Sequence, residues 1–554
     1  MTHCSRYLRL GLGGVLGLAT SLVSCRHRVE PTKFEMSEPQ LVEHLERAAK
    51  FLVELDVARA RTELDAIRAR RFEVDLMRAR LALAMGDCQG AVTLLASYAS
   101  EVVESGGANA SASGTLTPRA DPREAGLSAE LYSVANGCAH AMAGATILND
   151  EQRGVWVRFQ NPHDHVLMPL IAEVADRAAV AIGKHLGTAL PRPLRIELVA
   201  DLASLASVTG LPLPAAETTG TIAIARWGKV TIVSPRATPD GYPWQDTLAH
   251  ELTHLMVSRR SDDSAPLWLQ EGIAKREETR WRRRTPLDER DDSHREARQA
   301  LSEGRSVGVD RLGASIALLP TPKAAETAYA EVRDFLDYWV DNNGEPALIM
   351  LLHDLSGLRG DKVERAMMSV SGYTVNQWIL RWQHALMDES RRIATSPVQA
   401  ESAGQTEAQW DVDMARRLRL AELFVQHHAA AAVSAQLAPF ATLTGMPPEL
   451  LTQLALSEVW LGRIEAARRF VAPTLLHHLD GRWLALRGRV LVAAGDLLAA
   501  EEAFQLSLAF APTLDNVACR GFLRGEIDAS ATPAALPVTE PWASLCRAAL
   551  DLGH

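Results

Sequence analysis

Aromatic residues and excess positive charge are both scarce in this chain. Phe, Trp and Tyr make up 5% of its 554 residues, and the formal net charge is −10. Proteins that bind nucleic acids usually carry a basic stripe with interleaved aromatic residues, and none is visible here. Few aromatics, with abundant alanine, leucine and arginine, favour helix over strand. We therefore expect a helix-rich chain of roughly two to four domains that binds no nucleic acid.

Long hydrophobic runs are also missing. The longest, residues 10–23, follows Arg6 and Arg9 and is too short to span a bilayer comfortably, so it indicates a signal peptide. The run ends in Leu-Val-Ser-Cys, which resembles the lipobox of bacterial lipoproteins. An ordinary signal peptide with a chance cysteine is the alternative. The resemblance implies a signal peptide at residues 1–25, a lipid on Cys25 that attaches the protein to the membrane, and a location in the cell envelope. In a Gram-negative cell, sorting rules for such lipoproteins would suggest the outer membrane, facing the periplasm, because Arg26 and not an aspartate follows the cysteine. The cell surface is the alternative location.

Cysteine is rare as well, and no CxxC spacing suggests a redox motif or a second metal site. The chain has six cysteines, and four remain after the signal peptide and the predicted lipidation site: Cys88, Cys138, Cys519 and Cys546. In an oxidising periplasm, Cys88–Cys138 and Cys519–Cys546 would be disulfides. Four cysteines can pair in more than one way, and the sequence does not choose among the pairings.

Helical periodicity dominates the N-terminal part of the mature chain, residues 34–150. Residues 38–101 predict two helical hairpins. The second has Gly86-Asp87 at its turn, which resembles a tetratricopeptide (TPR) hairpin, and a plain helical bundle is the alternative. Residues 105–128 are rich in Gly, Ser, Ala and Pro and predict a linker, before a helix at 129–147.

A second TPR-like helical region is predicted at residues 410–554, after a linker at 391–409. Gly462 and Gly495 lie 33 residues apart, and so do Ala467 and Ala500. This offset is close to the ~34-residue TPR period, and small residues occupy positions where TPR helices pack closely. Stacked hairpins create concave surfaces, so both flanking regions could bind protein partners.

Between these regions, residues 153–390 combine strands with helices. Alternating apolar residues predict strands at 154–160 and 194–201 and a pair of short strands within 220–235, with an amphipathic helix at 164–187. Strands followed by helices describe a small α+β unit. We therefore expect an α+β, helix-rich chain with helical flanks.

The central unit contains an HExxH motif, formed by His250, Glu251 and His254. Histidines at i and i+4 project from one helical face and can bind one zinc ion. Glu251 lies on a neighbouring part of that face and could take a proton from water without being a ligand. The motif alone is a modest signal, but apolar residues around it and strands before it suit a buried active-site helix.

Glu271 is the predicted third zinc ligand. The spacing of metzincins would require a histidine where Arg260 stands, which excludes that class. Asp262 and Asp263 follow the second histidine too closely for a chain that must reverse and return. Glu271 follows a proline and an apolar run that suits a helix entering the core, although a structural glutamate near a helix start is the alternative. Two small residues should let this helix pack against the HExxH helix: Gly272 and Ala274.

The stretches HELTH and PLWLQEGIA, in this order of strands and helices, resemble the gluzincin metallopeptidases and their peptidase MA-like domains. The resemblance implies a zincin-like fold at 153–390 that hydrolyses peptide or protein substrates. Zinc would activate water, Glu251 would be the general base, and a strand within 220–226 would pair with the substrate. It also implies an oxyanion donor from a downstream helix. We predict Tyr329 for this role, and the alternatives are Tyr338, His353 and His384.

One position departs from the family pattern. Some thermolysin-like enzymes have an acidic residue four positions after the ligand glutamate, and this chain has Lys275 there. Asp246, Glu277 or Glu278 could orient a ligand histidine instead, and the sequence does not choose among them. We therefore expect a lipid-anchored zinc metallopeptidase. The alternative is a TPR scaffold whose peptidase-like domain is weakly active or inactive.

Overall fold

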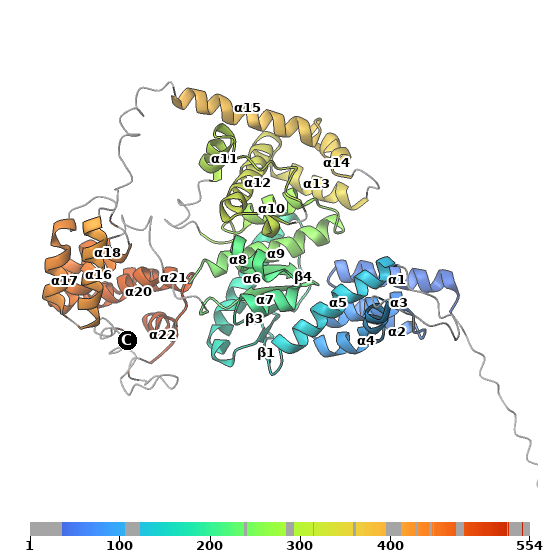
Figure 1. Ribbon diagram of the computed structural model, residues 1–554, viewed down its shortest axis with the longest axis horizontal. Helices are drawn as coiled ribbons and strands as arrows, with labels where there is room; N and C mark the ends of the chain where they lie inside the picture. The colour runs from blue at the N-terminus through green and yellow to red at the C-terminus, as the bar shows by residue number, and fades with distance from the viewer. Residues whose placement is uncertain are drawn as a thin grey trace, which may run out of the picture.

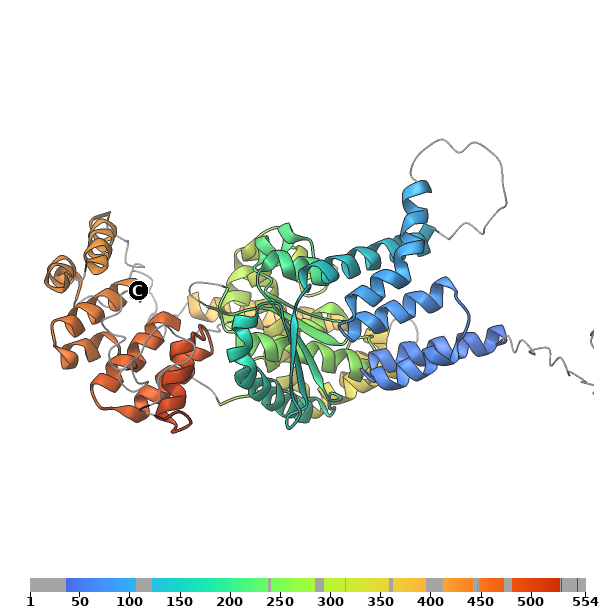
Figure 2. The ribbon, with the colours of Figure 1, turned by 90° about the horizontal axis from the view of Figure 1, so that it is seen from below.

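A computed structural model shows a central α+β unit with helical regions on either side (Figures 1 and 2). It describes residues 36–105, 122–237, 241–283, 293–313, 315–357, 362–394, 412–427, 429–441, 446, 448–472, 481–528, 530 and 546. The predicted signal peptide and Cys25 lie outside these residues, as does most of the predicted linker at 391–409. No described helix is long and apolar enough to cross a membrane. The expectation of a helix-rich α+β chain is confirmed.

The N-terminal region consists of helices packed as neighbouring hairpins. They are α1 (Glu38–Val53), α2 (Val57–Ala66), α3 (Phe72–Ala84), α4 (Cys88–Ser105) and α5 (Pro122–Ala141). The last helix differs from expectation, because residues 122–128 were predicted as linker and the helix was predicted to continue to 147. A disulfide joins Cys88, at the start of α4, to Cys138 in α5.

A five-stranded mixed sheet lies at the centre, in the order β1-β2-β3-β5-β4. Its strands are β1 (Thr146–Asp150), β2 (Val155–Phe159), β3 (Leu194–Val199), β4 (Ala223–Arg226) and β5 (Lys229–Val233). The inner pairs β2–β3 and β3–β5 are parallel, whereas β1 and β4 join the edges antiparallel. The four later strands were predicted, but β1 was not. The strand that the resemblance assigns to substrate, β4, is an edge strand of the sheet.

Helices cover both faces of the sheet. Successive residues of a strand point to opposite faces. Ile232 of β5 accordingly joins the main core with α6 (Met168–Leu186) and α9 (Trp244–Ser261), whereas Val233 packs with Leu205 of α7 (Leu202–Thr209). The fully buried β5 therefore lies between two helical layers.

The remaining elements of the central unit lie around the site. They are η1 (Pro162–Leu167), α8 (Leu213–Thr219), α10 (Leu267–Glu277), α11 (Ser293–Ser302), η3 (Ile316–Leu318), α12 (Pro322–Asn343), α13 (Glu345–Gly357), α14 (Lys362–Ser371) and α15 (Val375–Ala394). Helices α10–α15 lie above the sheet unit in Figure 1. Of these, α12 packs closely against α10.

The C-terminal region contains helical pairs whose turns use glycine. Its elements are α16 (Val412–Gln426), α17 (Ala430–Leu437), η4 (Ala438–Phe440), α18 (Pro448–Trp460), α19 (Ile464–Phe470), α20 (Gly481–Ala493), α21 (Leu497–Leu508) and α22 (Leu514–Leu523). Gly462 and Gly495 have positive φ in the turns after α18 and α20. Because only glycine adopts that conformation readily, the 33-residue offset corresponds to equivalent turns of two hairpins.

This region contacts the central unit at the start of α9. The indole N–H of Trp244 donates to the carbonyl of Leu508 at 2.7 Å, and the backbone N–H of Tyr242 donates to the carbonyl of Phe510 at 3.0 Å. A second disulfide, Cys519–Cys546, lies within the region itself. The α9 helix therefore begins at a junction between the two units.

Candidate metal centre

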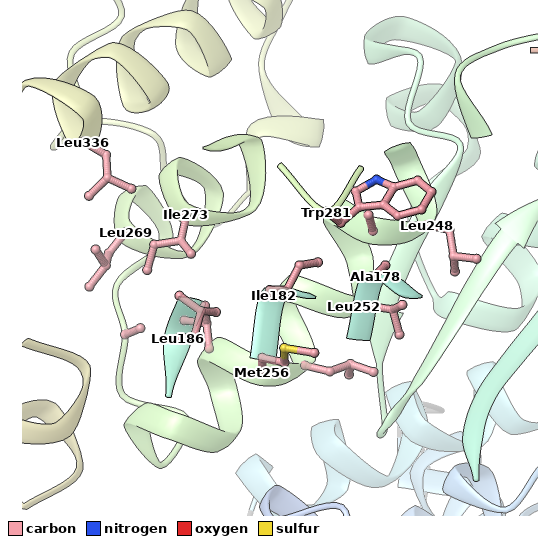
Figure 3. Packing of buried hydrophobic residues seen from close by; sticks show 14 of the residues in the cluster. Ala178, Ile182, Leu186, Leu248, Leu252, Met256, Leu269, Ile273, Trp281 and Leu336 are labelled. Atoms are coloured by element: carbon pink, nitrogen blue, oxygen red, sulfur yellow. The ribbon is translucent and has the colours of Figure 1, made fainter. Parts of the chain in front are cut away.

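Helix α9 has two different faces, and the apolar one fixes its position. Its apolar residues recur every four positions, as do those of the facing helix α6, so each forms a stripe along one side of its helix. Figure 3 shows the two stripes packed together: Leu248, Leu252 and Met256 on α9, and Ala178, Ile182 and Leu186 on α6. The HExxH residues therefore lie on another side of α9, which faces the site.

The chain reverses after α9 and returns as α10, which carries Glu271. Asp262 and Asp263 both have positive φ and turn the chain, and Pro266 precedes the first turn of α10. Aspartate tolerates this left-handed conformation better than most residues. The two aspartates thus make the reversal that the sequence pattern suggested, and they are not part of the His-Glu cluster.

The three predicted ligands meet at one point. Oε2 of Glu271 lies 3.5 Å from Nε2 of His250 and 3.6 Å from Nε2 of His254. All three ligand atoms lie within 4.8 Å of one another. Ligands about 2.1 Å from a tetrahedral zinc ion are about 3.4 Å apart, so these spacings fit the edges of such a site. Two imidazoles and a carboxylate are also a donor set that zinc prefers.

One buried oxygen supports this fit. Oε2 of Glu271 makes no hydrogen bond of good geometry within the described structure, although it is buried. A buried carboxylate oxygen without a partner is costly, and it points here at both ligand nitrogens. A cation among the three side chains would satisfy it.

Strong electrostatic coupling holds the cluster together. Burial lowers the pKa of His250, but its contacts with Glu271 and Glu278 outweigh burial and raise that pKa to about 10. Burial opposes ionisation of Glu271, yet the two histidines hold its pKa well below the usual range. The protein therefore keeps Glu271 anionic, as a metal ligand must be.

Glu278 is the residue that orients His250. Its Oε2 lies 3.1 Å from Nδ1 of His250, and Lys275 Nζ lies 2.6 Å from its other oxygen. Burial raises the pKa of Glu278, but Lys275 and His250 bring it down to about 2. The sequence left three candidates for this role, and the structure places the other two elsewhere. Asp246 binds Trp281 and Arg282, and Glu277 binds His185 and Arg280.

Glu251 lies between the metal ligands and the edge strand. Burial raises its pKa, while both histidines and the backbone N–H of Ala225 in β4 favour its ionised form. The edge strand therefore reaches the carboxylate predicted to be the general base. A carboxylate whose pKa is raised is better suited to accept a proton near neutral pH.

Tyr329 is the predicted oxyanion donor that reaches the site. Its ring centroid lies 6.3 Å from that of His250, and Lys275 Nζ lies 6.0 Å from its ring. Burial and three nearby glutamates raise the pKa of Tyr329 well above its usual value, so its hydroxyl stays protonated. Two alternatives have other partners: Tyr338 packs on Trp378, and His353 approaches Arg260. His384 is not among the residues that line the site.

The site opens into a cavity of about 220 Å³ beside β4. The lining contains the polar site residues His250, Glu251, His254, Gln270, Glu271 and Tyr329, together with Leu211, Thr221, Ala223, Ile224, Ala225, Leu255, Ser258, Ser315 and Ala317. The opening exposes the catalytic candidates next to an edge strand, where an extended peptide could pair.

The expected role of Gly272 needs correction. A Cβ at this position would lie 2.8 Å from the carbonyl of Val332 and 3.3 Å from Leu336. Both belong to α12, so the glycine permits close packing of α10 against α12 rather than against the HExxH helix. This contact sets the distance between the helix of Glu271 and the helix of Tyr329.

Comparison with known proteins agrees with this geometry. Residues 174–388 match the family model described as Peptidase MA superfamily. The matched stretch begins within α6, ends within α15, and contains both site helices. No curated protein and no solved structure matches the chain. The match supports a gluzincin-like, peptidase-type hydrolase domain at the centre of the chain.

Proposed function

We propose that this chain is a zinc metallopeptidase of the gluzincin type that hydrolyses internal peptide bonds. The observation that carries the proposal is the convergence of His250, His254 and Glu271 at 3.5 and 3.6 Å, around a buried carboxylate oxygen that makes no hydrogen bond of good geometry. The family match over residues 174–388 supports the reaction class.

The proposed ligands are His250, His254 and Glu271. Zinc, when bound there, supplies a Lewis acid that lowers the pKa of water and polarises a carbonyl. Glu278 accepts a hydrogen bond from Nδ1 of His250, which leaves Nε2 directed at the site. The protein thus prepares the orientation of this ligand, and metal binding would displace the proton from Nε2.

The remaining side chains perform proton transfer and charge stabilisation. Glu251 takes a proton from the attacking water and later gives it to the leaving amine. The Tyr329 hydroxyl donates a hydrogen bond to the oxygen that gains negative charge in the transition state. The edge strand β4 holds the substrate extended, so that the scissile carbonyl lies next to Glu251.

The proposal is tested by peptide hydrolysis with a matched pair of proteins. Zinc-loaded wild type and Glu251→Gln are incubated with a broad peptide library, and new termini are identified by mass spectrometry. Wild type should cut internal bonds, whereas the variant should retain zinc but not cut. Equal cutting by both proteins would overturn the role of Glu251. Zinc retention with no cutting by either would favour the scaffold alternative.

We also propose that the protein works in the cell envelope, attached through a lipid on Cys25. The lipobox-like end of the signal sequence supports this, as do two disulfides, which persist in oxidising compartments. We propose that the flanking hairpins are TPR-like and bind protein partners or present substrates. Metabolic labelling with a fatty-acid analogue, lost in Cys25→Ser, tests the anchor.

A further inference from the structure

A larger cavity, of about 540 Å³, adjoins the metal centre. Ala225, Leu255 and Ser258 line both this cavity and the smaller one at the site. One wall of the larger cavity belongs to the central unit and contains residues 190–195 and the turn between β4 and β5. The other comes from the N-terminal helices and consists of Ala49, Leu52, Val53, Leu55, Val57, Arg80 and Ala84.

The N-terminal helices are fixed against this part of the sheet. Trp227 in the β4–β5 turn has positive φ and packs on a cluster from α3, α4 and α5. A Cβ on the neighbouring Gly228 would lie 3.0 Å from Leu55. Arg158 of β2 donates to the carbonyl of Gly86 at 2.8 Å. The N-terminal helices, drawn in blue in Figure 2, therefore pack beside the central unit and contribute residues to the cavity lining.

Positive charge predominates on the lining. Arg80, Arg192, Arg195 and Arg226 line the cavity with one acidic residue, Asp263, which already accepts a hydrogen bond from Ser258. Arg192 is engaged with Asp176 and Arg226 with the carbonyl of Thr209. Within the described residues, Arg80 and Arg195 have no hydrogen bond or ion pair, and Arg195 only stacks on Trp156.

Within the part of the chain that the structure describes, Arg195 makes no ion pair with an acidic side chain. Its side chain is half-buried, and burial together with the nearby Arg61 lowers its pKa. A cation in such a place is stabilised by an anion, and a carboxylate is one of the groups that match the guanidinium geometry with two parallel hydrogen bonds.

The cavity lies where a side chain of a peptide substrate could supply that anion. Ala225 contacts the carboxylate of Glu251, and Trp227 is two residues farther along the chain. Two residues of extended chain span about 7 Å. A substrate strand paired with β4 would therefore enter the larger cavity within a few residues of the scissile bond.

From this geometry we propose that the cavity between the N-terminal helices and the central unit is a substrate subsite for an aspartate or glutamate side chain, roughly two to four residues from the cleaved bond. Arg195 and Arg80 are its specificity-determining residues. The inference rests on the proposed peptidase function, and it makes the N-terminal helices part of substrate recognition.

Cleavage profiling of the whole protein tests the subsite. Sites cut by wild type should be enriched in Asp or Glu at one such position. Replacing that residue with Gln or Asn in a synthetic peptide should lower kcat/KM roughly tenfold. Arg195→Glu and Arg80→Glu should reverse the preference toward Lys and Arg, and Arg195→Lys should keep it. Arg381→Glu is the matched control, because Arg381 also stacks on a tryptophan but lines neither cavity.

A binding measurement separates this inference from the proposed function. Fluorescein-labelled acidic peptide and its Gln counterpart are titrated into metal-free Glu251→Gln protein and followed by anisotropy. The acidic peptide should bind roughly tenfold more tightly, and added salt should weaken the difference. Cleavage by wild type with no acidic preference, and equal binding of the two peptides, would overturn the subsite alone. No cleavage of any peptide would overturn the proposed function instead.

Discussion

Glu278 Oε2 lies 3.1 Å from Nδ1 of His250, on the side of the ring opposite the nitrogen that faces Glu271. This hydrogen bond fixes the ring orientation and directs Nε2 at the site, where a bound metal would displace its proton. Lys275 holds Glu278 in place from its other oxygen. The lysine that departs from the family pattern therefore supports a carboxylate three residues later, which takes over the orienting role.

Glu278→Gln should weaken zinc binding by roughly 10- to 100-fold, because the histidine loses its anionic partner. Competition with a fluorescent chelator measures the affinity. The control is Glu277→Gln at the neighbouring position, whose carboxylate binds His185 and Arg280 instead. That variant should lose thermal stability while its zinc affinity stays at the wild-type value. Equal zinc affinity of Glu278→Gln and wild type would remove the orienting role.

Tyr329→Phe should lower kcat by about 100-fold with little change in KM, because the hydroxyl acts mainly in the transition state. Steady-state kinetics on one cleaved peptide provide the measurement. Tyr338→Phe is the control, since Tyr338 packs on Trp378 and does not line the site. If kcat of Tyr329→Phe equals that of wild type, Tyr329 is only a buried aromatic of the core.

Gly272→Ala should destabilise the fold by roughly 1–3 kcal/mol, because its Cβ would lie 2.8 Å from the carbonyl of Val332. Urea unfolding measures this free energy. Gly126→Ala is the matched control in α5, where a Cβ meets nothing within 4 Å, and it should gain up to about 1 kcal/mol. If Gly272→Ala has the same free energy of unfolding as wild type, α10 and α12 can move apart without loss of stability.

Stability should also depend on pH through His294. Hydrogen bonds with Asp334 and Glu389, at 2.8 Å each, raise its pKa from 6.5 to about 9. The raised pKa means that the folded state holds the proton more tightly than the unfolded chain does. This stabilisation is fully present below pH 6.5 and disappears as the pH rises through about 9.

The variant His294→Gln measures that contribution. Thermal unfolding should show it less stable than wild type at pH 6, and the difference should shrink steadily toward pH 10. A difference that stays constant over this range would mean that His294 contributes by packing and not by charge.

Local sequence patterns predicted much of the fold. Alternating apolar residues predicted β2, β3 and the β4–β5 pair, and the i, i+4 spacing predicted the helix that holds His250 and His254. The edge strand β1 was not predicted. Its five residues, TILND, are largely exposed, and the strand forms through its pairing with β2. The start of α5 was missed because a helix can begin at Pro122 within a stretch whose composition suggested linker.

The sequence could not predict contacts that depend on how the helices pack. Glu278 was one of three acidic candidates, and its contact with His250 is visible only once α9 and α10 are placed side by side. Gly272 was assigned to the wrong neighbour, because a small residue shows that a close approach occurs and not which helix approaches. The basic cavity depends on contacts between distant segments, such as Leu55 with Gly228, that leave no local pattern.

The metal content of the purified protein tests the central claim most directly. After dialysis against metal-free buffer and reloading, elemental analysis of wild type should find about one zinc ion per chain. His254→Ala and Glu271→Ala should each lose it, while Tyr338→Phe keeps it. Wild-type protein that holds no zinc after reloading, or variants that hold as much as wild type, would contradict the claim that His250, His254 and Glu271 form a metal site.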